Sequence, residues 1–236
     1  MIGEDLLDLG GAVALVTGAG QGAGRGTALE LARHNAGGIA VNDFVAERAE
    51  AVAAEVRALG VKAVAVPFDV GDLDAIRAAA DRVKAELGPI GILVNNAGMA
   101  GPGAQLRPRV NFWEEEPENW DNYLRTNLYG VFNCCHAIIP QMVEQKWGRI
   151  ITIVSDSGRV GEAKLAVYAA AKAGAAGFVR SIAKEVGRHN ITCNAISLSS
   201  MLPDWPQEQI DEFMATDRAK QQMSAYIVRR YGKAAD

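Results

Sequence analysis

Two side chains of complementary chemistry, those of Tyr168 and Lys172, stand four positions apart in a Tyr-Ala-Ala-Ala-Lys segment. If this segment is helical, both side chains lie on the same face. A free tyrosine has a pKa of about 10 and is a poor base at neutral pH, but a nearby ammonium group favours the phenolate and lowers this pKa. The spacing therefore predicts an acid–base device for proton transfer.

A glycine-rich turn, residues 17–24, lies upstream of this pair and suggests what the pair serves. Glycines allow the backbone to approach a pyrophosphate closely, and the N-terminus of a following helix attracts its charge. The spacing is Gly-x-x-x-Gly-x-Gly, although Gly20 makes the Gly-x-Gly-x-x-Gly register partly readable as well. The alternative is a turn that binds no ligand. The residues predicted to contact a dinucleotide here are Gly18, Gln21, Gly22, Ala23 and Gly24.

Acidic residues follow the next two apolar segments. Asp43 stands 19 residues after Gly24, where a carboxylate can bind ribose hydroxyls and repel a 2′-phosphate. Gln21 adds no positive charge to the turn, and Arg25 alone does not outweigh a carboxylate. We therefore expect NAD rather than NADP, with a helix N-cap as the alternative role for Asp43. Asp69, followed by Val70, is predicted to contact adenine or to cap a helix.

Short apolar segments alternate with alanine-rich segments of helical length, and this alternation predicts the fold. The predicted strands are 12–16, 39–42, 63–66, 92–94, 150–154 and 191–196, and the predicted helices are 26–34, 46–59, 73–87, 118–145 and 168–188. Pro140 should kink or break the fourth helix. Strands that are apolar throughout indicate a parallel sheet covered on both faces. We predict one doubly wound α/β domain of the Rossmann type over residues 1–236, with its chemistry at the carboxyl ends of the strands.

Composition narrows the classes of function. The net charge is −4 and the pI is about 5.5, which argues against a nucleic-acid partner. The sequence has no run of 18 apolar residues and begins without a signal-peptide pattern, so we expect a cytoplasmic protein with no membrane span. The cysteines, Cys134, Cys135 and Cys193, form no CxxC pair and the histidines are dispersed, so we expect no metal site.

Three motifs occur in a characteristic order: Thr17-Gly18-x-x-x-Gly22-x-Gly24, Asn95-Asn96-Ala97-Gly98 and Tyr168-x-x-x-Lys172. Together they resemble the NAD(P)-dependent short-chain dehydrogenase/reductase family over about residues 10–197. The resemblance implies the catalytic tetrad Asn127, Ser155, Tyr168 and Lys172. Ser155 precedes Tyr168 by 13 residues, Asn127 precedes Ser155 by 28, and Ser157 is the competing serine.

The resemblance also implies a role for each of these residues. Tyr168 exchanges a proton with the substrate oxygen while nicotinamide carries the hydride, and Ser155 hydrogen-bonds that oxygen. Lys172 lowers the pKa of the tyrosine and holds the nicotinamide ribose, and Asn127 anchors a proton-relaying water. The segment after the fourth strand would line the cofactor through Asn95, Ala97 and Gly98.

Two departures from the family pattern lie near the C-terminus. Leu198 and Ser199 replace the usual Pro-Gly pair, and Pro203 stands where a threonine is expected for the nicotinamide amide. Ser199 or Ser200 could substitute as the donor. The chain stops after a segment that in the family precedes a seventh strand, so we expect six strands. The resemblance implies a homo-oligomer, a tetramer or dimer, but a missing seventh strand weakens that inference.

Two segments are expected over the active site, a loop at 101–116 and a lid at 198–231. Their aromatic residues, among them Phe112, Trp113 and Trp205, would form an apolar pocket or serve ordinary packing. Residues 155–161 resemble enzymes that oxidise hydroxyacyl-CoA esters of ring acids. The cations that would then meet phosphates are Arg107, Arg109, Arg159 and Lys164. We expect an NAD-dependent dehydrogenase of a secondary alcohol, including a hydroxyacyl-CoA or another apolar cyclic alcohol, that runs as a ketone reductase in reverse. The alternatives are an NADPH-dependent 3-oxoacyl-ACP or -CoA reductase and a non-catalytic dinucleotide sensor.

Overall fold

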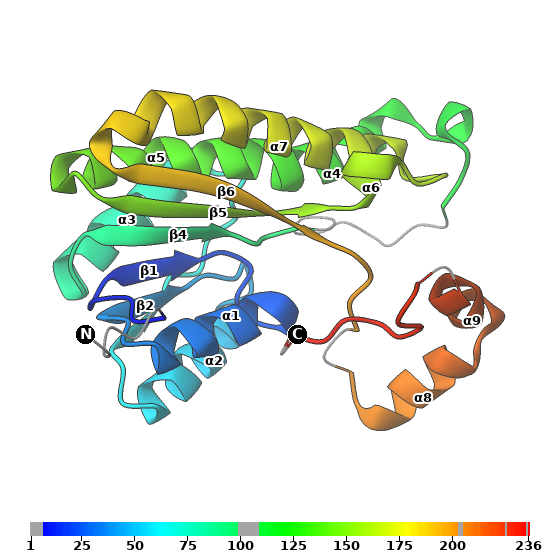
Figure 1. Ribbon diagram of the computed structural model, residues 1–236, viewed down its shortest axis with the longest axis horizontal. Helices are drawn as coiled ribbons and strands as arrows, with labels where there is room; N and C mark the ends of the chain where they lie inside the picture. The colour runs from blue at the N-terminus through cyan, green and yellow to red at the C-terminus, as the bar shows by residue number, and fades with distance from the viewer. Residues whose placement is uncertain (1–6, 99–108, 203–204, 225, 235) are drawn as a thin grey trace.

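A six-stranded parallel sheet forms the centre of the structure, a computed structural model that describes residues 7–98, 109–202, 205–224, 226–234 and 236 (Figure 1). The strand order is β3-β2-β1-β4-β5-β6, and every pairing is parallel. The strands are β1 Val13–Val16, β2 Gly38–Val41, β3 Ala63–Ala65, β4 Ile90–Asn95, β5 Gly148–Ser155 and β6 Ile191–Leu198. The predicted doubly wound fold is confirmed, and its chain reversal lies between β1 and β4, where ligands bind in such sheets.

Helices cover both faces of the sheet because its strands are apolar on both sides. Along β1, Ala14 and Val16 pack towards α1 and α2, whereas Val13 and Leu15 pack towards α3 and α5. Figure 1 shows α1 and α2 below the sheet and α5 and α7 above it. The long helices are α1 Gly22–Arg33, α2 Ala46–Ala58, α3 Leu73–Glu86, α5 Gly130–Gln145 and α7 Ala166–Val186.

The predicted helix at 118–145 consists of α4 Trp120–Leu124, a π-helical turn η3 Arg125–Tyr129, and α5. Of the kink or break expected at Pro140, the break does not occur, because α5 continues to Gln145. Pro140 and His136, whose carbonyl loses its intrahelical partner, are both exposed, so water can bond that carbonyl. The buried face of α5, which includes Ile138 and Met142, holds the helix against the sheet.

The region after β6 stands apart from the layers in Figure 1. It contains α8 Gln207–Ala215 and α9 Asp217–Ser224. Two hydrogen bonds join the beginning and the end of this region: the amide of Gly232 donates to Ser200 O at 3.0 Å, and the amide of Leu202 donates to Gly232 O at 2.9 Å. The chain after Gly232 then lies against α1. Ala234 packs so closely on Gly26 that a Cβ built on this glycine would lie 2.8 Å from Ala234 Cβ. The two ends of this region are thus held together, and its C-terminal end contacts α1.

The remaining elements are short turns of helix: η1 Phe112–Glu114, η2 Pro117–Asn119, α6 Ser157–Val160 and η4 Gly187–His189. In the described part of the chain, β6 forms one edge of the sheet, and the middle of this strand is exposed. None of the helices within the described ranges is long and apolar enough to cross a membrane.

Candidate active site

The end of β5 and the first turns of α7 bring three of the predicted catalytic residues together. Ser155 is the last residue of β5, and its hydroxyl forms a hydrogen bond with the phenol of Tyr168. Lys172 lies one helical turn further along α7, with its Nζ 5.9 Å from the centroid of the Tyr168 ring. This ammonium donates a 2.9 Å hydrogen bond to the Ile153 carbonyl. The helical spacing predicted from the sequence therefore places both side chains at one site.

The two candidate serines are distinguished by their partners. Ser157 is buried, and its hydroxyl donates to Glu162 Oε2 at 2.6 Å. The backbone amide of Ser157 donates to Ser155 Oγ at 3.2 Å, which helps to fix the Ser155 hydroxyl beside Tyr168. The arrangement therefore favours Ser155 as the serine that faces the substrate oxygen.

Asn127, the fourth tetrad residue, lies in the π-helical turn η3 and has no exposed surface. Its Nδ2 donates to Tyr123 O at 2.9 Å. A Cβ built on Gly98 would lie 3.3 Å from Asn127 Oδ1 and 3.4 Å from Lys172 Nζ. Gly98 therefore lets the chain after β4 run close to both polar groups. Single π-helical turns occur frequently at functional sites, and this one positions a predicted catalytic residue.

The proton affinity of Tyr168 is set mainly by its burial, which raises its pKa above 10.0. The hydrogen bond from Ser155 and the charge of Arg109 lower this pKa, whereas the charge of Glu162 raises it. Burial also lowers the pKa of Lys172 to about 8. The net effect at Tyr168 is a raised pKa, because desolvation dominates, and the ammonium of Lys172 is directed at Ile153 O. The lowering of the tyrosine pKa by Lys172 therefore stays a prediction.

The glycine-rich turn has the geometry of a phosphate cradle. Gly18 adopts φ +60°, and a Cβ there would lie 2.8 Å from Ala97 Cα. The side chain of Asn96 donates to Thr17 O at 2.9 Å and to Gly18 O at 3.0 Å, so it locks the turn to the segment after β4. Gly22, at φ +59°, begins α1, and the space where its Cβ would lie is open. These features fit a bound pyrophosphate at the N-terminus of α1.

Asp43 lies beside this turn and is 4 % exposed. Its Oδ1 accepts a 3.0 Å hydrogen bond from Val45 N, and a Cβ built on Gly20 would come 2.6 Å from its Oδ2. Arg48 is the residue that sequence reasoning missed. Its Nη2 lies 3.4 Å from Asp43 Oδ1, and its Nη1 donates to Gln21 Oε1 at 3.0 Å. The position of this arginine in the first turn of α2, five residues after Asp43, could have indicated its place beside the cofactor turn.

Two predicted cofactor contacts have other partners. The Asp69 carboxylate forms a 2.5 Å ion pair with Arg125 and accepts a 2.9 Å bond from Gly71 N. The Asn95 side chain donates to Thr152 Oγ1 at 3.2 Å and so links β4 to β5. Contacts of both residues with a cofactor therefore stay predictions.

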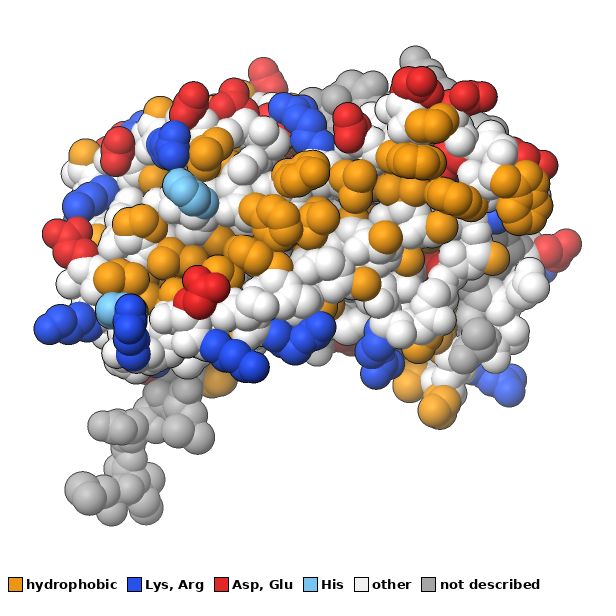
Figure 2. All heavy atoms as spheres, turned by 90° about the horizontal axis from the view of Figure 1, so that it is seen from above, with side chains coloured by type: hydrophobic (Ala, Val, Ile, Leu, Met, Phe, Trp, Pro, Cys, Tyr) orange, Lys and Arg blue, Asp and Glu red, His pale blue; other side chains and the backbone are white. Residues whose placement is uncertain are grey.

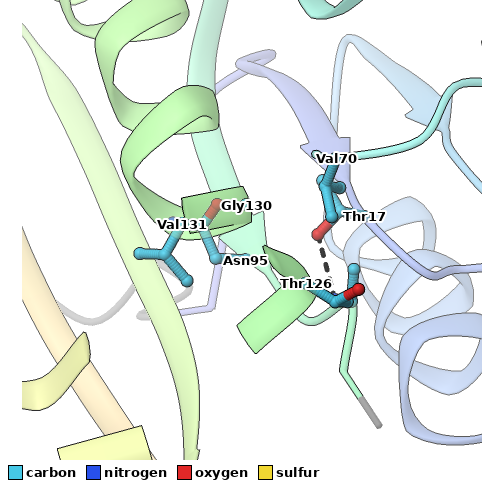
Figure 3. A pocket seen from close by; sticks show the side chains of 7 residues that line it. Thr17, Val70, Asn95, Thr126, Gly130 and Val131 are labelled. Atoms are coloured by element: carbon cyan, nitrogen blue, oxygen red, sulfur yellow. Dashed lines mark hydrogen bonds between the residues drawn. The ribbon is translucent and has the colours of Figure 1, made fainter. Parts of the chain in front are cut away.

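A narrow crevice lies where β1 and β4 end against the start of α5, and Figure 3 shows residues that line it, including Thr17, Val70, Asn95 and Thr126. Thr17 Oγ1 accepts a 3.0 Å hydrogen bond from Ala97 N. Val70 lines this crevice, and its contact with a cofactor stays a prediction.

Several described aromatic residues of the expected substrate loop and lid contact other aromatic side chains. Phe112 stacks on Trp120 with ring centroids 5.7 Å apart, whereas Trp113 is 80 % exposed. In the lid, Phe213 contacts both Trp205 and Tyr231. Trp205 and Phe213 also line a pocket of about 340 Å³ on the lid, so their role in an apolar substrate pocket stays a prediction.

The polar residues of these segments are also partnered. Arg109 pairs with Glu162 at 2.7 Å, and Arg159 lies 3.5 Å from Asp156. The hydroxyls of Ser199 and Ser200 both bond to Tyr226 OH, at 3.0 and 2.7 Å. Arg107 and Pro203 lie outside the described residues. Within the part of the chain that is described, no three His, Cys, Asp or Glu residues gather as metal ligands.

Comparisons with known proteins agree with this geometry. A profile of the short chain dehydrogenase family matches residues 12–212. The chain is 38 % identical over 225 residues to the 3-oxoacyl-acyl-carrier-protein reductase FabG of Staphylococcus aureus, covering 94 % of this chain and 86 % of that protein. It is 33 % identical over 227 residues to the 5-keto-D-gluconate 5-reductase of Escherichia coli, covering 96 % and 83 % of the two chains.

Among solved structures, a gluconate 5-dehydrogenase from Burkholderia cenocepacia in complex with NADP and tartrate superposes with a TM-score of 0.83. That protein is 30 % identical, and the match covers 97 % of this chain and 85 % of the other. Motifs, strand order, site geometry and these likenesses agree with one another, and the chain is an oxidoreductase that belongs to the short-chain dehydrogenase family.

Proposed function

We propose that this protein moves a hydride between NAD(H) and a secondary alcohol or the corresponding ketone, with Tyr168 as the proton-transferring residue. The observation that carries the proposal is the hydrogen-bonded pair of Ser155 and Tyr168 at the carboxyl end of β5. Lys172 and Asn127 both approach Gly98 beside this pair. The site thus combines a proton-transferring hydroxyl with a phosphate cradle.

The residues of this chain would divide the work as follows. Gly18 and Gly22 would hold the pyrophosphate, Asp43 the adenosine ribose, and Lys172 the nicotinamide ribose. A bound nicotinamide supplies or accepts the hydride. The Ser155 hydroxyl would donate a hydrogen bond to the substrate oxygen.

The neighbouring phenol of Tyr168 would transfer the proton. In alcohol oxidation, Tyr168 would accept the hydroxyl proton as a phenolate, and in ketone reduction it would donate that proton as a phenol. Its raised pKa in the absence of ligands favours the phenol, and the positive charge of an oxidised nicotinamide nearby would favour the phenolate.

NAD is the cofactor we propose, because the buried Asp43 carboxylate follows β2 beside the glycine-rich turn, where it would meet the adenosine ribose of a bound dinucleotide. Arg48 opposes this assignment, since a guanidinium can bind a 2′-phosphate, but it is already paired with Asp43 and Gln21. The structural neighbour solved with NADP favours the same alternative. Steady-state kinetics with NAD and NADP would decide, and a higher kcat/KM with NADP would overturn the NAD assignment.

The proposed substrate is a secondary hydroxyl on an apolar ring or acyl group, including a hydroxyacyl-CoA. A 3-oxoacyl thioester is the second candidate, favoured by the 38 % identity to a reductase of that class. The deciding experiment is a screen of both cofactors against hydroxyacyl thioesters, 3-oxoacyl thioesters, sterols and sugar alcohols. Dinucleotide binding without turnover of any of these would support a non-catalytic sensor instead.

We further propose that the protein forms a homo-oligomer through the face of α5 and α7. Tyr129, Phe132 and Phe178 form an aromatic cluster there, with centroid distances of 6.1 and 4.6 Å, and Tyr129 is 51 % exposed. Figure 2 shows hydrophobic side chains gathered in a band on the side where Figure 1 shows these helices. Light scattering should show a dimer or tetramer that Tyr129→Glu weakens and Leu59→Glu, another exposed site, leaves intact. A monomeric wild type would contradict the proposal.

A further inference from the structure

We propose that the ion pair of Glu162 and Arg109 is a positioning device for proton transfer, which holds the catalytic hydroxyls in place and balances the charge that Tyr168 faces. This inference rests on the proposed function, in which Tyr168 exchanges the proton. Neither residue belongs to the tetrad, and they come from different segments: Glu162 precedes α7, and Arg109 precedes η1.

The first support is the way Glu162 is fixed. Gly161 adopts φ +80° after the short helix α6, and its amide donates to Ser157 O at 3.0 Å, so the chain turns back over that helix. One carboxylate oxygen of Glu162 then accepts from Ser157 Oγ at 2.6 Å, and the other accepts from Arg109 Nη1 at 2.7 Å. Both oxygens are therefore held by separate donors.

The second support is the connection from Glu162 to the catalytic hydroxyls. Ser157 binds Glu162 through its hydroxyl and Ser155 Oγ through its backbone amide at 3.2 Å. The Ser155 hydroxyl in turn bonds to Tyr168. If Glu162 were displaced, Ser157 would move with it, and this movement would displace Ser155, whose hydroxyl orients the phenol of Tyr168.

The third support is electrostatic. Among the described residues, the ionisable groups around Tyr168 include Lys172 on its own helix, Tyr123 of α4 with its ring 6.0 Å away, Glu162 and Arg109. Glu162 raises the pKa of Tyr168 and Arg109 lowers it. Because the two charges oppose each other, the intact pair fixes the geometry at little net electrostatic cost, while loss of either member alone would unbalance the site.

The test compares Glu162→Gln, Arg109→Gln and the double variant with wild type. Glutamine at 162 can still accept the Ser157 hydrogen bond, so the substitution removes charge and keeps most of the geometry. The phenol of Tyr168 is titrated by ultraviolet absorbance as the difference from Tyr168→Phe, without cofactor or substrate. The pH dependence of kcat/KM for alcohol oxidation is a second readout.

We expect Glu162→Gln to lower the pKa of Tyr168 by about half a unit, Arg109→Gln to raise it by a similar amount, and the double variant to return close to wild type. The matched controls are Glu144→Gln and Lys84→Gln, which remove single charges from an exposed ion pair elsewhere. Shifts in the same direction, or no larger than the controls show, would overturn the inference. Opposed absorbance shifts in a protein that oxidises no alcohol would uphold the charge balance at Tyr168 and refute the proposed function together with the role of the pair in proton transfer.

Discussion

Burial of Lys172 should destabilise the fold at neutral pH, and the size of this effect follows from the structure. The residue is 4 % exposed, and burial lowers its pKa from 10.5 to about 8. This difference corresponds to about 3 kcal/mol against the charged form, at about 1.4 kcal/mol per pKa unit. Between these two pH values the unfolded chain binds more protons than the folded one, so stability should rise with pH there. The full penalty applies below about pH 8 and vanishes above about pH 10.5.

Lys172→Met removes this titration while keeping an unbranched side chain of similar length. It also leaves Ile153 O without its 2.9 Å donor, at a cost of about 1 kcal/mol. The variant should therefore be about 2 kcal/mol more stable than wild type near pH 7 and about 1 kcal/mol less stable above about pH 10.5. The variant should be inactive, because it lacks the ammonium that we propose holds the nicotinamide ribose. A gain in stability with a loss of activity is typical when a destabilising residue serves function.

Urea unfolding followed by tryptophan fluorescence at a series of pH values measures this difference. Lys184→Met, at an exposed position on the same helix, is the control and should show a stability difference that changes little with pH. The reasoning would be refuted if the stability difference between Lys172→Met and wild type did not decrease as the pH rises from 8 to 10.5.

Three further predictions concern the cofactor turn and the serines. Asp43→Asn should shift the ratio of kcat/KM for NADP over NAD upward by about tenfold, equivalent to about 1.4 kcal/mol, and an unchanged ratio would exclude Asp43 as the discriminating residue. Gly18→Ala places a side chain at φ +60° and 2.8 Å from Ala97 Cα. It should cost about 2 kcal/mol in chemical unfolding and weaken cofactor binding, and wild-type values in both would contradict the described turn. Ser155→Ala should lower kcat/KM by about 100-fold, well beyond the loss in Ser157→Ala, and the reverse order would exchange the two roles.

Local sequence patterns were sufficient to predict the fold and many residues of the candidate site. The apolar runs predicted all six strands to within two residues at each end, because burial on both faces leaves a continuous signal. Tyr168 and Lys172 were found because a helix fixes the relation of residues four apart. Ser155 and Asn127 were predicted from the spacing of the family's motifs rather than from a physical argument.

Features that depend on tertiary packing were not predictable in this way. Pro140 continues α5 because a buried helix face outweighs one lost hydrogen bond at an exposed position. The orientation of Lys172 towards Ile153 O depends on how α7 crosses β5. Arg48 and Glu162 act through contacts with residues that are distant in sequence or lie across a turn, so the sequence did not identify the partners of their charges.

The most direct test of the central claim is the comparison of Tyr168→Phe with wild type, using calorimetry for NAD binding and single-turnover kinetics for hydride transfer. The account predicts an unchanged dissociation constant and a rate lower by about a thousandfold, because only the proton-transferring hydroxyl is removed. Hydride transfer at the wild-type rate in this variant would contradict the account.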